Sequence, residues 1–249
     1  MIELGFRPGR NRNHKAIFMK DIFRLRYPWI LKQRGYLPAL FLAALFMTSL
    51  GLFPAGASEQ DPGIQNIRKG VFLVAAPQLS DPNFHRTVVL LIAYEKAGAV
   101  GLIINRPTDT PIIKALPDLH RVETLSNSLY FGGPVGQNSL VVLLRSKKLP
   151  NEGHKVFNDI YVTQSRDTLA EVLEDPNPER NIRIYAGYAG WGPGQLDRET
   201  SHGDWVIIDA DPESIFSEKP SEIWTELHKR SKKIEVDNKQ ISLETAMSW

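Results

Sequence analysis

The 249-residue sequence contains no cysteine, and this absence removes a whole class of chemistry. Without a thiol the chain has no thiolate nucleophile, no dithiol redox couple, no disulfide and no cysteine-based zinc site. The same absence leaves the cellular compartment open, because a cysteine-free chain is viable in either redox environment.

The sequence also lacks the short motifs that mark common catalytic and nucleotide-binding sites. It has no G-x-S-x-G elbow for a serine nucleophile. The Gly132-Gly133 turn carries neither the lysine nor the Ser or Thr of a phosphate-binding loop. The six histidines follow no metal-binding spacing, so we expect no metal and no cofactor. The sequence therefore favours a non-enzymatic protein and identifies no catalytic residue.

Most of the chain lacks an excess of positive charge, although the formal net charge is +2. Residues 1–36 hold nine Lys and Arg against two acidic residues, a net +7, which leaves the rest of the chain at −5. Nonspecific nucleic-acid binding requires a clustered positive surface. A nucleic-acid partner is therefore disfavoured for the acidic part.

An apolar segment, Leu37 to Phe53, follows the basic region and precedes Ala55-Gly56-Ala57. A basic region, an apolar region and a small-x-small triplet are typical of a secretory signal, here with cleavage before Ser58. We expect a leader over residues 1–57, a linker over 58–66 and export to the periplasm.

Two other interpretations of the leader stay open. An uncleaved anchor would hold the chain in the inner membrane, although seventeen residues is near the lower limit for a spanning helix. In both cases the positive charge should stay cytoplasmic, with the domain on the other side of the membrane. Alternatively, the segment is a buried core helix of a cytoplasmic protein whose start is mis-annotated. Initiation at Met19 in place of Met1 would shorten the basic region to the length that is ordinary for an export signal.

Runs rich in β-branched residues alternate with turn residues beyond residue 66 and predict strands. Three helices are expected between and after them: one capped by Ser165 and ending near Asp175, one beginning at Pro193, and one over residues 220–229. Strands outnumber helices without regular alternation, which favours an α+β domain over residues 67–231, followed by a polar tail over 232–249. The predicted strands are Val71–Ala76, Thr87–Tyr94, Ala99–Asn105, Leu129–Phe131, Leu140–Arg145, Val156–Val162, Ile182–Ala186 and Trp205–Asp209.

Four segments together resemble the AlgH/YqgE-like family of bacterial proteins. The resemblance implies a bifurcated, mostly antiparallel sheet with a small barrel, wrapped by helices. It also implies a group described as transcriptional regulators without an established activity. The leader is additional to the family pattern, and His85 stands where a basic or variable residue is expected. The segments are Phe72–Pro77 with Asp81–Val89, Gly101–Pro107, Phe131–Val135 and Ala186–Glu199.

The residues of each segment also suggest structural roles, independently of the family resemblance. Asp81-Pro82 predicts an Asx-type turn between two strands. An arginine such as Arg86, entering a buried strand, needs a carboxylate, carbonyl groups or a ligand anion. Asn105 and Arg106 are expected at a sheet end, where both turn chemistry and a binding site are common.

The glycines allow two interpretations. Gly132-Gly133 can permit close backbone approach or form an anion-binding nest. The run from Gly187 to Gly194 is expected to join a strand to a helix start, which either packs tightly or attracts anions. The residues of this run and its helix that we take as candidate ligand contacts are Gly190, Trp191 and Gln195.

Three functions remain open. The first is a binding or regulatory module that holds a small anion or a protein partner in a groove near Arg86, Arg106 and the Gly187–Gly194 run. The second is an exported hydrolase or transferase whose site gathers Asp81, His202 and Asp204. The third is a cytoplasmic transcriptional regulator, which requires that the leader be mis-annotated.

Overall fold

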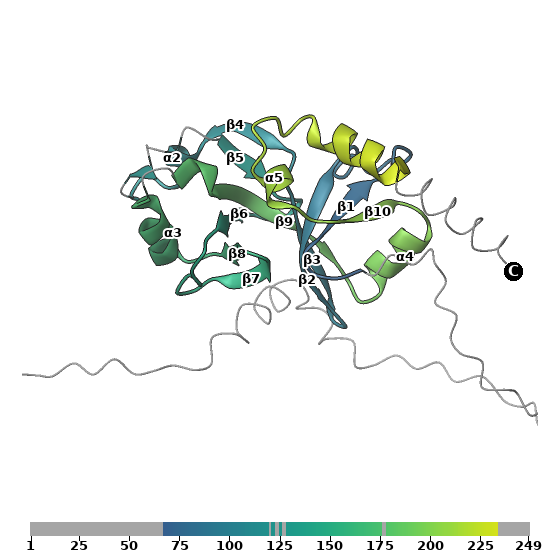
Figure 1. Cartoon of the computed structure of the whole chain (residues 1–249), viewed down its shortest axis with the longest axis horizontal. Helices are drawn as coiled ribbons and strands as arrows, with labels where there is room; N and C mark the ends of the chain where they lie inside the picture. Colours follow the sequence, from purple (N-terminus) through teal and green to yellow (C-terminus); the bar gives the residue numbers. More distant parts are fainter. Residues whose placement is uncertain (1–66, 120, 123–124, 126–127, 176–177, 234–249) are drawn as a thin grey trace, which may run out of the picture. The chain divides into compact units, whose positions relative to one another are not determined.

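The computed structural model describes residues 67–119, 121–122, 125, 128–175 and 178–233 (Figure 1). The chain divides after residue 64, so every described residue belongs to the second unit. The predicted leader and linker, and all but the first two residues of the predicted tail, lie outside the described residues. Within the described part, no helix is long and apolar enough to cross a membrane.

The strands occur along the whole described chain, and short helices interrupt them. Beyond α5, residues 223–233 are also helical. The helices are α2 (Ile112–Ala115), α3 (Arg166–Leu173), the 3-10 turn η4 (Pro178–Arg180), α4 (Gln195–Ser201) and α5 (Pro212–Ile215). The strands are β1 (Val71–Ala75), β2 (Val88–Glu95), β3 (Gly98–Ile103), β4 (Pro107–Pro111), β5 (Ser128–Phe131), β6 (Val135–Arg145), β7 (His154–Phe157), β8 (Ile160–Thr163), β9 (Ile182–Trp191) and β10 (Trp205–Asp209).

The sheet branches at β9, which lies in the middle of the unit in Figure 1. The main strand order is β10-β1-β2-β3-β9-β6-β8-β7, and β5 pairs with both β9 and β4. The end of β9, Ala189 to Trp191, pairs with β3, whereas its first half pairs with β6 and β5. The β5–β9 pair is parallel, and the other strand pairs of the described residues are antiparallel. The predicted α+β class and mostly antiparallel sheet are confirmed.

Two hydrophobic clusters lie on the two halves of the branched sheet. One gathers side chains of β1, β2, β3 and β10 with Ala189 and Trp191 from the end of β9. The other gathers side chains of β6, β8, α2 and α3 with Ile182 and Ile184 from the start of β9. A single strand therefore supplies both cores, which ties the two halves together. The small barrel and the helices wrapped around it stay predictions.

The strand predictions were wrong in several places. Strand β4 was not predicted, because Pro107 was expected to end a strand and instead begins one, and β6 begins at Val135 in place of Leu140. The predicted strand Val156–Val162 is a hairpin of β7 and β8, with the left-handed Asn158 (φ 40°) in its turn. Asparagine tolerates that conformation better than most residues, which was the missed signal. The expected turn at Gly187 is strand as far as Trp191, because these small residues allow close contact with neighbouring backbone.

The helix predictions met with mixed results. Ser165 caps α3 as predicted, because its hydroxyl oxygen accepts a hydrogen bond from the Thr168 N–H. Pro193 is not the first helical residue, since α4 is capped by Gly194 in a left-handed conformation (φ 64°). The last helix covers residues 223–233 and therefore begins three residues later than expected.

Candidate functional site

An exposed turn from Asp81 to Arg86 connects β1 to β2 and follows the predicted Asx pattern. The Asp81 carboxylate accepts the Asn83 N–H at 2.8 Å. The Asp81 carbonyl accepts the N–H groups of Phe84 and His85 at 2.9 and 2.8 Å. The backbone of the turn is thus closed on its first residue, and the Asx-type interpretation is confirmed.

Arg106 fastens this turn from the side. Its guanidinium donates to the carbonyls of Asn83, Pro82 and His85 at 2.7, 3.3 and 3.0 Å. Burial lowers the pKa of Arg106, and the nearby Asp81 charge acts in the opposite direction. The donors of Arg106 therefore hold the chain's own carbonyls, which is turn chemistry.

Asn105 is buried and joins the turn to β2. Its side-chain oxygen accepts the Val88 N–H at 2.9 Å, and its amide donates to the Arg86 carbonyl at 3.0 Å. The side chain replaces a backbone partner at the point where the chain enters the strand. Both polar atoms of Asn105 thus have internal partners.

Phe84 points from the turn into the core. Its ring lies 6.0 Å from that of Trp191, nearly parallel, and 5.6 Å from that of Trp205, edge to face. Such offset and edge-to-face pairs are favourable aromatic arrangements. The middle of the exposed turn is therefore anchored on the ends of β9 and β10.

Glu199 of α4 holds the two tryptophans beneath Phe84. Its Oε2 accepts both indole N–H groups, from Trp191 at 2.8 Å and from Trp205 at 2.9 Å. Its Oε1 accepts the Gln195 amide at 2.8 Å, and the Gln195 oxygen accepts the Gly192 N–H at 3.0 Å. We missed this role of Glu199 in the sequence. The Gln195–Glu199 spacing of four residues on a helix was the available signal.

The Gly132-Gly133 turn is in close contact with the backbone of β9. A Cβ on Gly132 would lie 2.3 Å from the Gly187 carbonyl oxygen, and one on Gly133 would lie 2.3 Å from the Ala189 nitrogen. The Gly132 N–H donates to the Ala186 carbonyl at 2.9 Å. Close backbone approach is therefore the role that the contacts support, in place of an anion-binding nest. Gly190 pairs with Val100 of β3 within the sheet.

Arg86 does not enter a buried strand, which corrects the sequence-based interpretation. It is exposed and left-handed (φ 53°), and β2 begins two residues later. Its guanidinium lies 4.6 Å from the ring centre of Trp224, whose indole N–H donates to the Ala75 carbonyl at 2.8 Å. Stacking on the tryptophan thus orients this cation.

No contact among the described residues brings together Asp81, His202 and Asp204, the three residues of the hydrolase or transferase alternative. Asp81 and His202 are exposed, Asp204 is half-buried, and no hydrogen bond or ion pair among the described residues joins their side chains. In the same part of the chain, no three His, Asp or Glu side chains gather closely enough to hold a metal ion.

The four segments singled out in the sequence therefore meet in one region. The turn of the first segment is held by Arg106 of the second and packs on Trp191 of the fourth. The third segment packs on the backbone of that same fourth segment. Asp81, Asn83, His85 and Arg86 remain exposed on the outside of this assembly. This exposed part of the turn is the candidate site.

Comparison with known proteins gives a consistent result. A family model described as AlgH-like matches residues 72–234. A UPF0301 protein of Myxococcus xanthus is 36% identical over 168 residues, covering 65% of this chain and 88% of that protein. A UPF0301 protein of Idiomarina loihiensis is 38% identical over 157 residues, covering 61% of this chain and 84% of that protein.

Solved structures agree with the fold. The solution structure of the AlgH protein from Pseudomonas aeruginosa matches with a TM-score of 0.55 and 33% identity, over 64% of this chain and 86% of that one. A crystal structure of a protein from Corynebacterium diphtheriae matches with a TM-score of 0.56, over 67% of this chain and 88% of that one. Its 24% identity supports the likeness in fold alone.

Proposed function

The chain belongs to the AlgH-like family, and from this premise we propose that it is a binding or regulatory module that recognises a protein partner through the exposed Asp81–Arg86 turn. No biochemical activity is established for this family, so the proposal rests on the geometry of the turn and not on a relative's function.

The observation that carries the proposal is the way in which Arg106 holds the turn. One guanidinium donates to three carbonyls of an exposed segment, while Asn105 and Phe84 fix its end and its middle. Recognition sites work best when supporting residues lock the residues that touch the partner. A turn fastened from three sides meets this requirement.

The displayed side chains suggest the chemistry of the partner. His85 and Arg86 are exposed, and Arg86 adopts a left-handed conformation that is unfavourable for its residue type. The exposed guanidinium over the Trp224 ring suits a carboxylate on the partner's surface. Small-molecule sites are usually concave, so an exposed turn favours a protein over a small anion.

Photo-crosslinking in the native cell tests this proposal. A photoreactive amino acid at Asn83 keeps the backbone bonds of the turn, and Lys96, exposed between β2 and β3, is the matched control position. We expect a discrete crosslinked protein from position 83, absent from position 96 and lost when Arg86→Ala is added. A crosslink that survives Arg86→Ala and His85→Ala together, or no crosslink at position 83, would contradict the proposal.

The hydrolase or transferase alternative has less support, because its three residues share no described contact. A hydrolase or transferase activity of the purified protein that is lost in both the Asp81→Asn and the His202→Ala variant would favour the enzyme over the binding module.

We further propose that the module works outside the cytoplasm, on the basis of the leader over residues 1–57. Mass spectrometry of the first peptide, after cell fractionation, should find the chain beginning at Ser58 in the periplasm. An intact leader in the membrane fraction would indicate a tethered module. A soluble cytoplasmic chain with a later start would contradict export and favour the regulator interpretation, which a steep salt-dependent affinity for DNA would support.

A further inference from the structure

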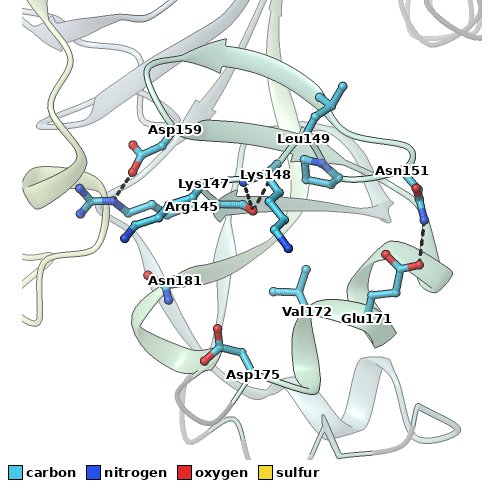
Figure 2. A pocket seen from close by; sticks show the side chains of 12 residues that line it. Arg145, Lys147, Lys148, Leu149, Asn151, Asp159, Glu171, Val172, Asp175 and Asn181 are labelled. Atoms are coloured by element: carbon cyan, nitrogen blue, oxygen red, sulfur yellow. Dashed lines mark hydrogen bonds and ion pairs between the residues drawn. The ribbon is translucent and has the colours of Figure 1, made fainter.

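A cavity of about 710 Å³ lies between the loop after β6 and the C-terminal end of α3 (Figure 2). Its volume falls in the range of about 300 to 1,000 Å³ that is usual for small-ligand sites. The lining shares no residue with the Asp81–Arg86 turn, so the cavity is a separate feature from the proposed recognition site.

One wall of the cavity is cationic. Lys147 and Lys148 belong to the loop over residues 146–151, and Figure 2 shows Lys148 reaching from this loop toward Val172. The nearby Arg145 is paired with Asp159 at 2.7 Å, so its charge is compensated. Within the described residues, neither lysine has a carboxylate at ion-pair distance.

The facing wall is acidic. Glu171 and Asp175 lie at the C-terminal end of α3, where the helix carbonyls add partial negative charge and the last turn holds no basic residue. The Glu171 carboxylate accepts the Asn151 amide at 2.8 Å, and no cation lies at ion-pair distance from it in the described part of the chain. The two walls therefore carry opposite charge across one open space.

Apolar side chains lie between these walls. Val172 is half-buried in α3, and Leu149 is 65% exposed at the edge of the cavity. A single exposed leucine on a surface is ordinary. Leu149 also lines the cavity, but Figure 2 shows its side chain pointing away from Val172, so Val172 is the apolar side chain that a ligand between the two walls would cover.

We propose that this cavity binds a small zwitterion with apolar side chains, of the class of short peptides with a free amino and a free carboxyl group. The ligand's carboxylate meets Lys148, its ammonium meets Glu171, and an apolar side chain of the ligand covers Val172, which lies beside both in Figure 2. A simple anion is repelled by the acidic wall and a simple cation by the lysines, so the lining selects a ligand with both charges.

The binding should be weak and measurable. The charged groups are exposed, and exposed ion pairs contribute little, so removing one ligand charge is expected to weaken binding about two- to fivefold. The probes are the dipeptide leucyl-leucine, its N-acetyl form, which lacks the ammonium, and its C-terminal amide, which lacks the carboxylate. These three share the apolar side chains and differ only in charge.

NMR titration of the ¹⁵N-labelled full chain measures the three affinities. We expect leucyl-leucine to shift the amide signals of residues 146–149, 151 and 172, and to bind about two- to fivefold more tightly than either blocked form. If the N-acetyl form binds as tightly as the free dipeptide, the ammonium is not recognised and the cavity is an anion site. If the C-terminal amide binds as tightly, the carboxylate is not recognised and the cavity is a cation site. No shift at these residues would overturn it.

Substitutions test which residues of the protein contact the ligand's carboxylate and which contact its ammonium. Lys148→Met, combined with Lys147→Met in case one lysine replaces the other, should weaken leucyl-leucine but leave the C-terminal amide unchanged. Glu171→Gln should weaken leucyl-leucine but leave the N-acetyl form unchanged. Lys96→Met, an exposed lysine outside the cavity, is the matched control. If the lysine variants weaken the amide as much as the free dipeptide, the assigned carboxylate contact is wrong.

Discussion

Glu199 shows at the scale of one residue why this fold needs particular side chains. Its carboxylate accepts three donors, from Trp191, Trp205 and Gln195, and these come from two strands and a helix. A buried or half-buried donor that loses its acceptor costs more than the bond contributes, since the group also gave up its hydration. The carboxylate therefore fixes the positions of Trp191 and Trp205, the two rings on which Phe84 packs.

Replacing Glu199 by Gln should lower the free energy of unfolding by about 1 to 3 kcal/mol. The glutamine side chain keeps only one oxygen to accept the three hydrogen bonds. Its NH₂ group, itself a donor, replaces the other oxygen and faces a donor that is left without an acceptor. Urea unfolding followed by tryptophan fluorescence measures the change. Glu226→Gln, at an exposed position of the last helix, should stay within about 0.5 kcal/mol. An equal effect of the two substitutions would contradict the role of Glu199.

Tyr94 offers a test at the same scale by pH. Its hydroxyl donates to Asp197 at 2.5 Å, and this bond, with some desolvation and the aspartate charge, raises the pKa of Tyr94 to about 12. The folded state favours the neutral phenol, so this contribution to stability is complete below pH 10 and is lost as the pH rises toward 12.

Asp197→Asn should therefore bring the pKa of Tyr94 back toward 10. An NMR titration of the tyrosine ring carbons, with Tyr94→Phe to assign the signal, measures it. A pKa that stays near 12 in Asp197→Asn would mean that burial alone controls the phenol.

At the scale of elements, β9 is the strand on which both halves of the sheet depend. The Gly132-Gly133 turn between β5 and β6 packs against its backbone at Gly187 to Ala189. Gly133 has φ 149°, and a Cβ there would lie 2.3 Å from backbone atoms that cannot move without disturbing the sheet. Close approach and conformation both require glycine at this position.

Gly133→Ala should be severely destabilising, by about 3 kcal/mol or more, or should prevent folding. Gly203→Ala is the matched control, because Gly203 also has a positive φ (78°) but no atom lies within 4 Å of its added Cβ. It should cost about 1 to 2 kcal/mol from backbone conformation alone. Thermal unfolding by circular dichroism compares the two, and similar melting temperatures would contradict the close contact.

At the scale of the whole molecule, the hydrophobic clusters described above draw on strands from the first of the described chain, β1, to the last, β10. The helix of residues 223–233 belongs to this unit, since Trp224 donates to Ala75 of the first strand. The family model covers nearly the same range, residues 72–234. We therefore predict that the unit after residue 64 folds as an independent domain.

A chain of residues 65–249 should fold with the same free energy of unfolding as the full chain, within about 0.5 kcal/mol. Urea unfolding of both chains measures this, with tryptophan fluorescence as the signal. A loss of several kcal/mol on removing residues 1–64 would mean that the leader contributes to the fold, and would contradict the predicted domain boundary.

The sequence alone determined the elements whose signals are local. The apolar β-branched runs of β1, β2 and β10 predicted strands, Ser165 predicted a helix cap, and Asp81-Pro82 predicted the Asx turn, because each depends on neighbouring residues only. The four family segments were also recognisable in the sequence, although nothing in it showed that they meet.

Only the tertiary structure decided what the polar and small residues do. Glycines 187 and 190 were expected in a turn and lie in a strand, because the backbone that approaches them comes from β3, β6 and the Gly133 turn. Arg106 appeared as a separate charge, yet its carbonyl partners lie more than twenty residues earlier in the chain, at 82, 83 and 85. The partners of Glu199 are only four to eight residues away, but two of them lie on different strands, β9 and β10, which the fold brings to the same carboxylate. Lys148 and Glu171 line one cavity for a similar reason: the loop after β6 and helix α3 come together only when the core folds.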